Sequence, residues 1–240
     1  MKRLFLLLIP ALMLFSCKST NIKKEQVSQW DSLLLEQGII KVYEPLRAFI
    51  AETDSTESYY DISLVDIEKY HGKVCPGIAT GFQMFREVLE KLYPNSVPVR
   101  GQVAVACSKP NDMLDVASFI LGIRNFYGRS ELGKGLLVVD TTLSPGVPKE
   151  FVMIFKRLDN GKTLKVTFDK YKLMNPEDWP LIDQTVMMFE HHEPIPEDQL
   201  ERYQKTVHNE VMHILTNGPR EGVYKIEEID NYTFEFENKN

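Results

Sequence analysis

Apolar residues recur along much of the chain at the three- to four-residue spacing of an amphipathic helix. The firmest pattern covers residues 78–93 and ends at Pro94. The same spacing predicts further helices over residues 27–51, 61–70, 112–123 and 196–216. In the first of these, Gly38 or Pro45 is expected to interrupt the helix.

Between the helices, alternating or Val-rich segments predict strands. The strongest signal is a hairpin, because Asn160-Gly161 joins residues 151–158 to 163–171 and Asn-Gly accepts positive φ. Further strands are expected over residues 99–107, 136–140 and 223–236, and a loop over 176–180. Helices and strands mix without a repeating βα unit, so the expected class is α+β, with helices packed on a small mixed or antiparallel sheet.

The first residues predict export and a lipid anchor. Lys2 and Arg3 precede an apolar run over residues 4–15, which is too short for a permanent membrane span and is typical of a signal peptide. The run leads into Leu14-Phe15-Ser16-Cys17, which resembles a bacterial lipobox. We expect cleavage before Cys17, lipidation of its thiol and a polar tether over residues 18–27. Lys18 is not an acidic retention signal, which favours the periplasmic side of the outer membrane.

Composition narrows the function classes. The 240 residues are 43% hydrophobic and 26% charged, as in an ordinary folded protein with one sizeable domain. The formal net charge of −6 gives no electrostatic footprint for nucleic acid. Three cysteines are too few for a disulfide-built scaffold.

Two cysteines and a histidine form the strongest candidate for chemistry. Cys75 is expected to cap the helix that begins near Pro76, Cys107 ends a predicted strand, and His71 lies four residues before Cys75. A helix N-terminus stabilises a thiolate, which suits a metal ligand or a nucleophile. Two thiolates and an imidazole would leave a coordination position open, as in catalytic zinc sites, and the soft ligands also allow iron or copper.

These residues resemble a known family, the FmdE proteins, which are named for the operon of molybdenum formylmethanofuran dehydrogenase. The family's H-G-H-x-C-P-G run is matched by residues 71–77 with one change, and a strand ending in Cys107 follows. Asp115 to Gly122 is similar to the family's next helix, and Gly133-Lys134-Gly135 to the segment after that helix. The resemblance implies an α+β FmdE-like domain over residues 57–172, preceded by a helical segment over 28–56 and followed by a helix and strand extension over 173–240.

The resemblance also implies a pocket in which His71, Cys75 and Cys107 bind a transition metal, with zinc or iron expected. Lys73 replaces the family's second His and would bind an anionic ligand if it points into the pocket. The gap after Cys107 is about four residues longer than in the family pattern, so either Asp112 or Asp115 is the expected acid/base or orienting carboxylate. The family name does not fix an activity here, and the residues leave open whether the protein is an enzyme.

A second hypothesis is a lipid-anchored binding module in which Cys75 and Cys107 form a disulfide or are inert thiols. Haem capture through His71 or Cys75 is a variant of the metal hypothesis. The expected partners are a small-molecule ligand, a membrane through Cys17 and, as an allowed state, a second copy of the chain. The remaining histidines are interpreted as surface groups, namely His191, His192, His208 and His213.

Overall fold

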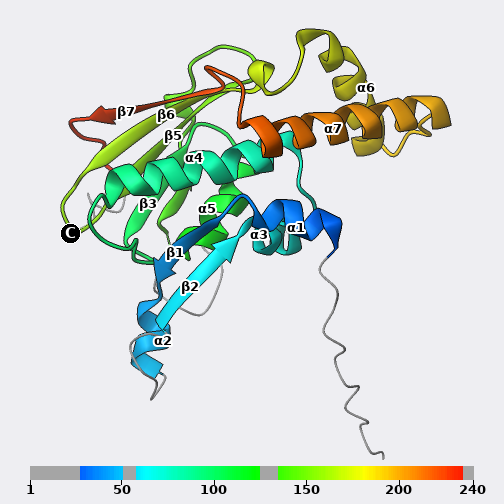
Figure 1. Cartoon of the computed structure of the whole chain (residues 1–240). Coiled ribbons are helices and arrows are strands. Elements are labelled where there is room, and N and C mark those ends of the chain that lie inside the picture. The colour runs from blue at the N-terminus through cyan, green and yellow to red at the C-terminus, as the bar shows by residue number, and fades with distance from the viewer. Residues whose placement is uncertain (1–27, 51–57, 125–134, 235–240) are drawn as a thin grey trace, which may run out of the picture.

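The computed structural model describes residues 28–50, 58–124 and 135–234 (Figure 1). The helices of these segments are α1 (Gln29–Leu35), α2 (Pro45–Ile50), α3 (Leu64–His71), α4 (Pro76–Leu92), α5 (Met113–Leu121), α6 (Trp179–Glu190) and α7 (Glu197–Asn217). The strands are β1 (Ile39–Tyr43), β2 (Tyr59–Ser63), β3 (Val103–Cys107), β4 (Leu137–Val139), β5 (Glu150–Arg157), β6 (Thr163–Asp169) and β7 (Tyr224–Ile229). Short 3-10 turns occur at η2 (Thr141–Leu143), η3 (Lys170–Leu173) and η4 (Pro176–Asp178). The predicted α+β class is confirmed.

A five-stranded sheet of order β4-β3-β5-β6-β7 forms the centre of the fold. β3 and β4 are parallel, and the other neighbours in this sheet are antiparallel. The predicted hairpin is confirmed, because β5 pairs with β6 and Gly161 in the turn has a φ of 76°. β1 and β2 form a separate antiparallel ribbon.

Helices cover one face of this sheet, and α4 lies across it (Figure 1). The ring of Phe85 on α4 meets Phe155 of β5 edge to face, with 5.2 Å between centroids. Phe151 and Phe168 stack beside them at 4.8 Å. These four rings are buried, and both geometries are favourable for aromatic pairs. The core therefore fixes α4, and with it the residues at its N-terminus.

The opposite face of the sheet carries a smaller apolar cluster. Its buried members are Ala104, Ala106, Val152, Ile154 and Phe234. Tyr232 packs against this cluster, and its hydroxyl donates to a carboxylate oxygen of Asp140. The chain after β7 therefore returns across this face, and β7 ends well before the end of the strand segment expected over residues 223–236.

The N-terminal region differs most from the sequence expectation. The predicted helix over residues 27–51 is broken at Gly38 and Pro45, but the piece between these residues is the strand β1. The expected helix over 61–70 likewise begins as β2, with α3 starting only at Leu64. Strands β1 and β2 pair with each other over five residues, and this pairing outweighs the local helical spacing.

The region around α6 also differs. The expected loop over residues 176–180 is the turn η4 followed directly by the start of α6, a helix that the sequence analysis did not assign. Trp179 and Ile182 at its start are buried, so packing against the body supports this helix. Among the residues described here, no helix combines the length and the apolar character that crossing a bilayer requires.

Candidate functional site

The candidate site lies where α3 ends and α4 begins. His71 is the last residue of α3, and Gly72 caps that helix with a φ of 97°, a left-handed conformation that glycine adopts without strain. Cys75 is the N-cap of α4, as predicted, and Pro76 occupies the first turn. The Ile78 N–H donates to Cys75 Sγ at 3.4 Å. The turn between the two helices therefore presents an imidazole and a thiol four residues apart.

Two carboxylates reach this turn from the start of α5. Asp115 Oδ2 lies 2.8 Å from Nδ1 of His71. Asp112 Oδ2 lies 3.8 Å from Nε2 of the same ring and 3.7 Å from Cys75 Sγ. We call His71, Cys75, Asp112 and Asp115 the His71 cluster. The sequence left open which aspartate faces the histidine, and the structure places both there.

The state of the imidazole follows from these contacts. A carboxylate only accepts hydrogen bonds, so the short contact with Asp115 assigns the proton of a neutral His71 to Nδ1. The lone pair of Nε2 then remains available on the side of Asp112. The His71 side chain is 11% exposed, whereas Asp112 and Asp115 are about half exposed at 53% and 50%. In the His71 cluster the imidazole is therefore largely buried, and the two carboxylates beside it are accessible to solvent.

Cys107 is at the end of β3, as predicted, but its thiol bonds to residues other than His71 and Cys75. It is fully buried, donates to the Lys109 carbonyl at 3.1 Å and accepts from Asn111 Nδ2 at 3.1 Å. Asn111 Oδ1 also accepts from the Met113 N–H at 2.9 Å, which holds the start of α5. Asn111 was missed by the sequence analysis, although an Asn just before a helix is a typical capping signal.

Both thiols are free, so the Cys75–Cys107 disulfide of the second hypothesis is not formed in this structure. Burial raises the pKa of Cys75 above its ordinary value of 9.0; the Ile78 N–H and the Lys73 charge lower it, and Asp112 raises it further. Burial also raises the pKa of Cys107. At Cys75 burial therefore outweighs the helix end and the pKa is raised, whereas the sequence predicted that the helix end stabilises the thiolate.

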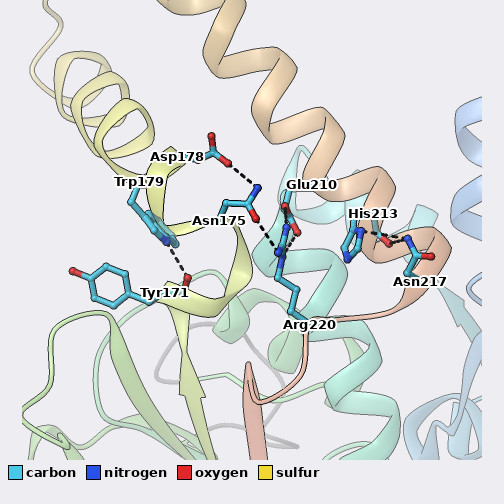
Figure 2. Close-up of polar contacts among 8 residues, drawn as sticks. All are labelled: Tyr171, Asn175, Asp178, Trp179, Glu210, His213, Asn217 and Arg220. Carbon is cyan, nitrogen blue, oxygen red and sulfur yellow. Dashed lines mark hydrogen bonds and ion pairs between the residues drawn. The ribbon is translucent and has the colours of Figure 1, made fainter.

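The other sequence candidates fall into three groups. Lys73 is exposed and close enough to Cys75 to act on its charge. The remaining histidines do not join the cluster: His191 and His192 are exposed, His208 packs near Trp30, and His213 contacts Asn217 on α7 (Figure 2). Cys17, the tether and Gly133-Lys134 lie outside the described residues.

In the segments that the structure covers, no three His, Cys, Asp or Glu side chains stand in the arrangement of a ready metal site. The set His71, Cys75 and Cys107 is therefore not preassembled. What the structure brings together is an imidazole, one thiol and two carboxylates at the meeting point of α3, α4 and α5.

The fold is α+β, with a mixed five-stranded sheet, and the four residues of the His71 cluster lie at the ends of helices α3, α4 and α5. Comparison with family models identifies the family: residues 70–221 match FmdE, described as "Molybdenum formylmethanofuran dehydrogenase operon". The match covers well over half of the chain and includes the whole His71 cluster, and the chain belongs to the FmdE family. Comparisons with curated proteins and with solved structures gave no match.

Proposed function

We propose that this protein binds a transition metal ion through His71, Cys75 and Asp112. The observation that supports the proposal is the position of Asp112 Oδ2, which lies 3.8 Å from His71 Nε2 and 3.7 Å from Cys75 Sγ. In a tetrahedral zinc site, bond lengths of about 2.0–2.3 Å separate neighbouring ligand atoms by about 3.3–3.6 Å. The two separations that involve Asp112 exceed this range by a few tenths of an ångström, and the described residues hold no ready three-ligand group, so metal binding requires these side chains to move.

The surroundings of the histidine support the same proposal. A metal-bound imidazole usually donates its second ring N–H to a carboxylate, which fixes the tautomer and the ring orientation. His71 has this arrangement before any metal binds, because Asp115 holds Nδ1 at 2.8 Å and leaves Nε2 free for the metal. Asp115 is therefore assigned a positioning role and Asp112 the role of a ligand.

Cys107 is assigned a supporting role in this proposal. Its sulfur is buried and hydrogen-bonded to Lys109 and Asn111, and Asn111 is the neighbour of Asp112. Cys107 thus positions the loop that carries Asp112. It would become a ligand only if these hydrogen bonds were broken.

The donor set indicates the kind of metal and ligand. One thiolate, one imidazole and one carboxylate suit zinc or iron, and three protein donors leave a position for an outside ligand. A metal bound there would supply Lewis acidity to that ligand. Lys73 adds a positive charge near Cys75, which favours an anionic small molecule. The signal-like N-terminal sequence supports the further part of this proposal, a location outside the cytoplasm on a protein anchored through a lipidated Cys17.

Metal content of purified variants tests the proposal. The protein is purified anaerobically, and zinc and iron are measured per chain by elemental analysis. We expect about one metal per chain for the wild type, and at least a tenfold loss of affinity for Cys75→Ser, His71→Ala and Asp112→Asn. Cys107→Ser changes the same residue type, and it should weaken metal binding less than Cys75→Ser does, because Cys107 acts only through the loop that carries Asp112.

Thiol counting separates this proposal from the second hypothesis. With metal bound, Cys75 should resist alkylation until a chelator is added, and two thiols should then titrate under denaturing conditions. Equal metal content in Cys75→Ser and the wild type would contradict the assignment. A chain with no metal and no titratable thiols would support the disulfide-linked binding module instead.

A further inference from the structure

The short helix α2 presents an apolar surface that nothing in the described chain covers. Leu46, Phe49 and Ile50, which we call the α2 tip, are 37%, 88% and 71% exposed. No residue of α2 is buried. Figure 1 shows α2 at the far end of the β1–β2 ribbon, away from the five-stranded sheet. Large apolar side chains gain stability when they leave water, so the α2 tip is suited to contact with an apolar partner.

Aromatic and basic side chains lie on the β1–β2 ribbon and at the start of α2. The Tyr43 and Tyr59 rings lie 5.3 Å apart, and Lys41 Nζ is 5.2 Å from the centroid of Tyr59. The guanidinium of Arg47 lies 5.2 Å from the centroid of Tyr60. Tyrosine beside lysine or arginine is the composition that proteins place at the headgroup level of a bilayer, next to side chains that enter the acyl region.

The size of the α2 tip argues against a second copy of the chain as its partner. A stable dimer buries about 800 Å² on each partner. Three side chains on a six-residue helix provide much less than this. Partial insertion into a membrane surface needs no such area, because a few apolar groups enter the lipid separately.

The length of the N-terminal segment permits contact with the membrane. Twelve residues, from Cys17 to Ser28, connect the expected lipidation site to the start of α1. A fully extended chain of this length spans at most about 40 Å. If Cys17 is acylated, as in the proposed function on which this step rests, the folded body stays within this distance of the bilayer.

We propose that the α2 tip inserts into the surface of the phospholipid bilayer as a second membrane contact of the lipoprotein. The apolar side chains enter the boundary between headgroups and acyl chains, and the tyrosines and basic residues around them lie among the headgroups. Two contacts, the acyl chains at Cys17 and the α2 tip, restrict how the body is oriented on the membrane.

Depth-dependent fluorescence quenching tests the proposal. The full processed protein carrying Phe49→Trp is reconstituted into vesicles of phosphatidylethanolamine and phosphatidylglycerol with brominated acyl chains. The matched control is Phe189→Trp on α6, since Phe189 is also strongly exposed, at 73%. The wild-type signal of Trp30 and Trp179 is subtracted. We expect at least twofold stronger quenching of the tryptophan at position 49 than of that at position 189.

Equal quenching at positions 49 and 189 would overturn the proposal. A dimer in detergent, seen by sedimentation as twice the chain mass, would also overturn the proposal if Phe49→Ser returned the protein to a monomer. A second copy of the chain would then cover the α2 tip. The intact mass and the metal content of the same preparation report on Cys17 acylation and on the His71 cluster. If Cys17 proves not to be acylated, quenching by the same vesicles, added to the unanchored chain, still tests whether the α2 tip inserts. Failure of the α2 proposal can therefore be told apart from failure of the proposed function.

Discussion

Single residues of α4 decide how closely α5 can approach it. Gly81 leaves a notch that the side chain of Met113 fills, and a Cβ at Gly81 would come within 2.3 Å of the Met113 sulfur. The group that approaches α4 most closely at Gly81 is therefore a side chain. Met113 is buried, so it has little room to move away.

We therefore expect Gly81→Ala to lower the free energy of unfolding by about 1–3 kcal/mol, the usual cost of overpacking a core. Urea denaturation measures the change. Gly77→Ala is the control, because its Cβ would meet Cys75 Sγ at an ordinary 3.6 Å and should leave stability unchanged or slightly higher. Adding Met113→Ala to Gly81→Ala should relieve the clash. Strictly additive losses in the double variant would contradict this explanation.

Tyr224 gives a prediction for alkaline pH. Burial, together with the charge and hydrogen bond of Glu87, raises the pKa of Tyr224 to about 12. The unfolded chain titrates near the ordinary value of about 10, so the neutral phenol stabilises the folded state fully below pH 10. This stabilisation is lost as the pH rises from about 10 to about 12.

Denaturant unfolding of the wild type and Tyr224→Phe at pH 9, 10 and 11 measures the effect. The unfolding free energy of the wild type should fall more steeply with pH than that of the variant. Some slope should remain in the variant, because burial also raises the pKa of Tyr93. Parallel pH profiles for the two proteins would show that Tyr224 does not contribute.

At the scale of residues, the sequence predicted which residues belong to the candidate site more successfully than it predicted which of them contact each other. His71 and Cys75 follow from a local motif, and a helix end fixes both of them. Spacing alone cannot tell which way the last side chain of a strand points, so the contacts of Cys107 were not predictable, whereas Asn111 carried a capping signal that went unused. Asp115 lies 44 positions beyond His71, and only tertiary packing brings the two together.

Elements with strong local signals were predicted well. α4 has apolar residues at helical spacing with Pro76 in its first turn, and the β5–β6 hairpin has its Asn-Gly turn. β1 and β2 were missed because their stability comes from pairing with each other. α6 was missed although Trp179 and Ile182 stand at helical spacing, because the prolines around it resembled a loop.

The attachment of α7 gives a prediction at the scale of elements. Arg220, in the segment after α7, donates to both carboxylate oxygens of Glu210 at 2.9 and 2.7 Å and to Asn175 at 3.1 Å (Figure 2). Glu210 is buried, with 7% of its side chain exposed. Removing the arginine leaves this carboxylate unpaired, so we expect Arg220→Ala to cost about 3 kcal/mol of unfolding free energy.

Denaturant unfolding and hydrogen exchange check this expectation. Exchange should rise in the last turns of α7 and at the start of β7, and not in β3. Asn175→Ala is the control, because it removes one neutral partner and should cost only about 1 kcal/mol. A cost for Arg220→Ala no greater than for Asn175→Ala would contradict a stabilising ion pair.

At the scale of the whole molecule, the candidate site depends on the core. α3 and α4 supply His71 and Cys75. Asp112 and Asp115 lie beside them only because β3 pairs in the sheet and α5 packs on α4. The cluster lies at these element ends, so a ligand bound there would stabilise the folded state as a whole. Loading the His71 cluster with the proposed metal should therefore raise the melting temperature in step with the metal content.

The lipid anchor proposed at Cys17 gives a prediction at the scale of the whole molecule. The lipobox-like sequence before it predicts cleavage and acylation, and several acyl chains together anchor a protein stably to a membrane. We expect the wild type to fractionate with the outer membrane and to have the mass of a chain that begins at Cys17 and carries acyl groups. Cys17→Ala should remain an unacylated precursor. Cell fractionation and intact mass spectrometry measure both outcomes.

Two further variants make the membrane prediction specific. Cys75→Ser changes a cysteine of the folded body and should leave acylation and fractionation unchanged, which separates the lipid anchor from the metal proposal. Lys18→Asp introduces an acidic residue next to Cys17, the proposed lipidation site, and should shift the protein to the inner membrane, since Lys18 is the basis for expecting outer-membrane sorting. An unmodified Cys17 in the mature wild-type chain would contradict the lipoprotein assignment, whatever the metal content of the His71 cluster.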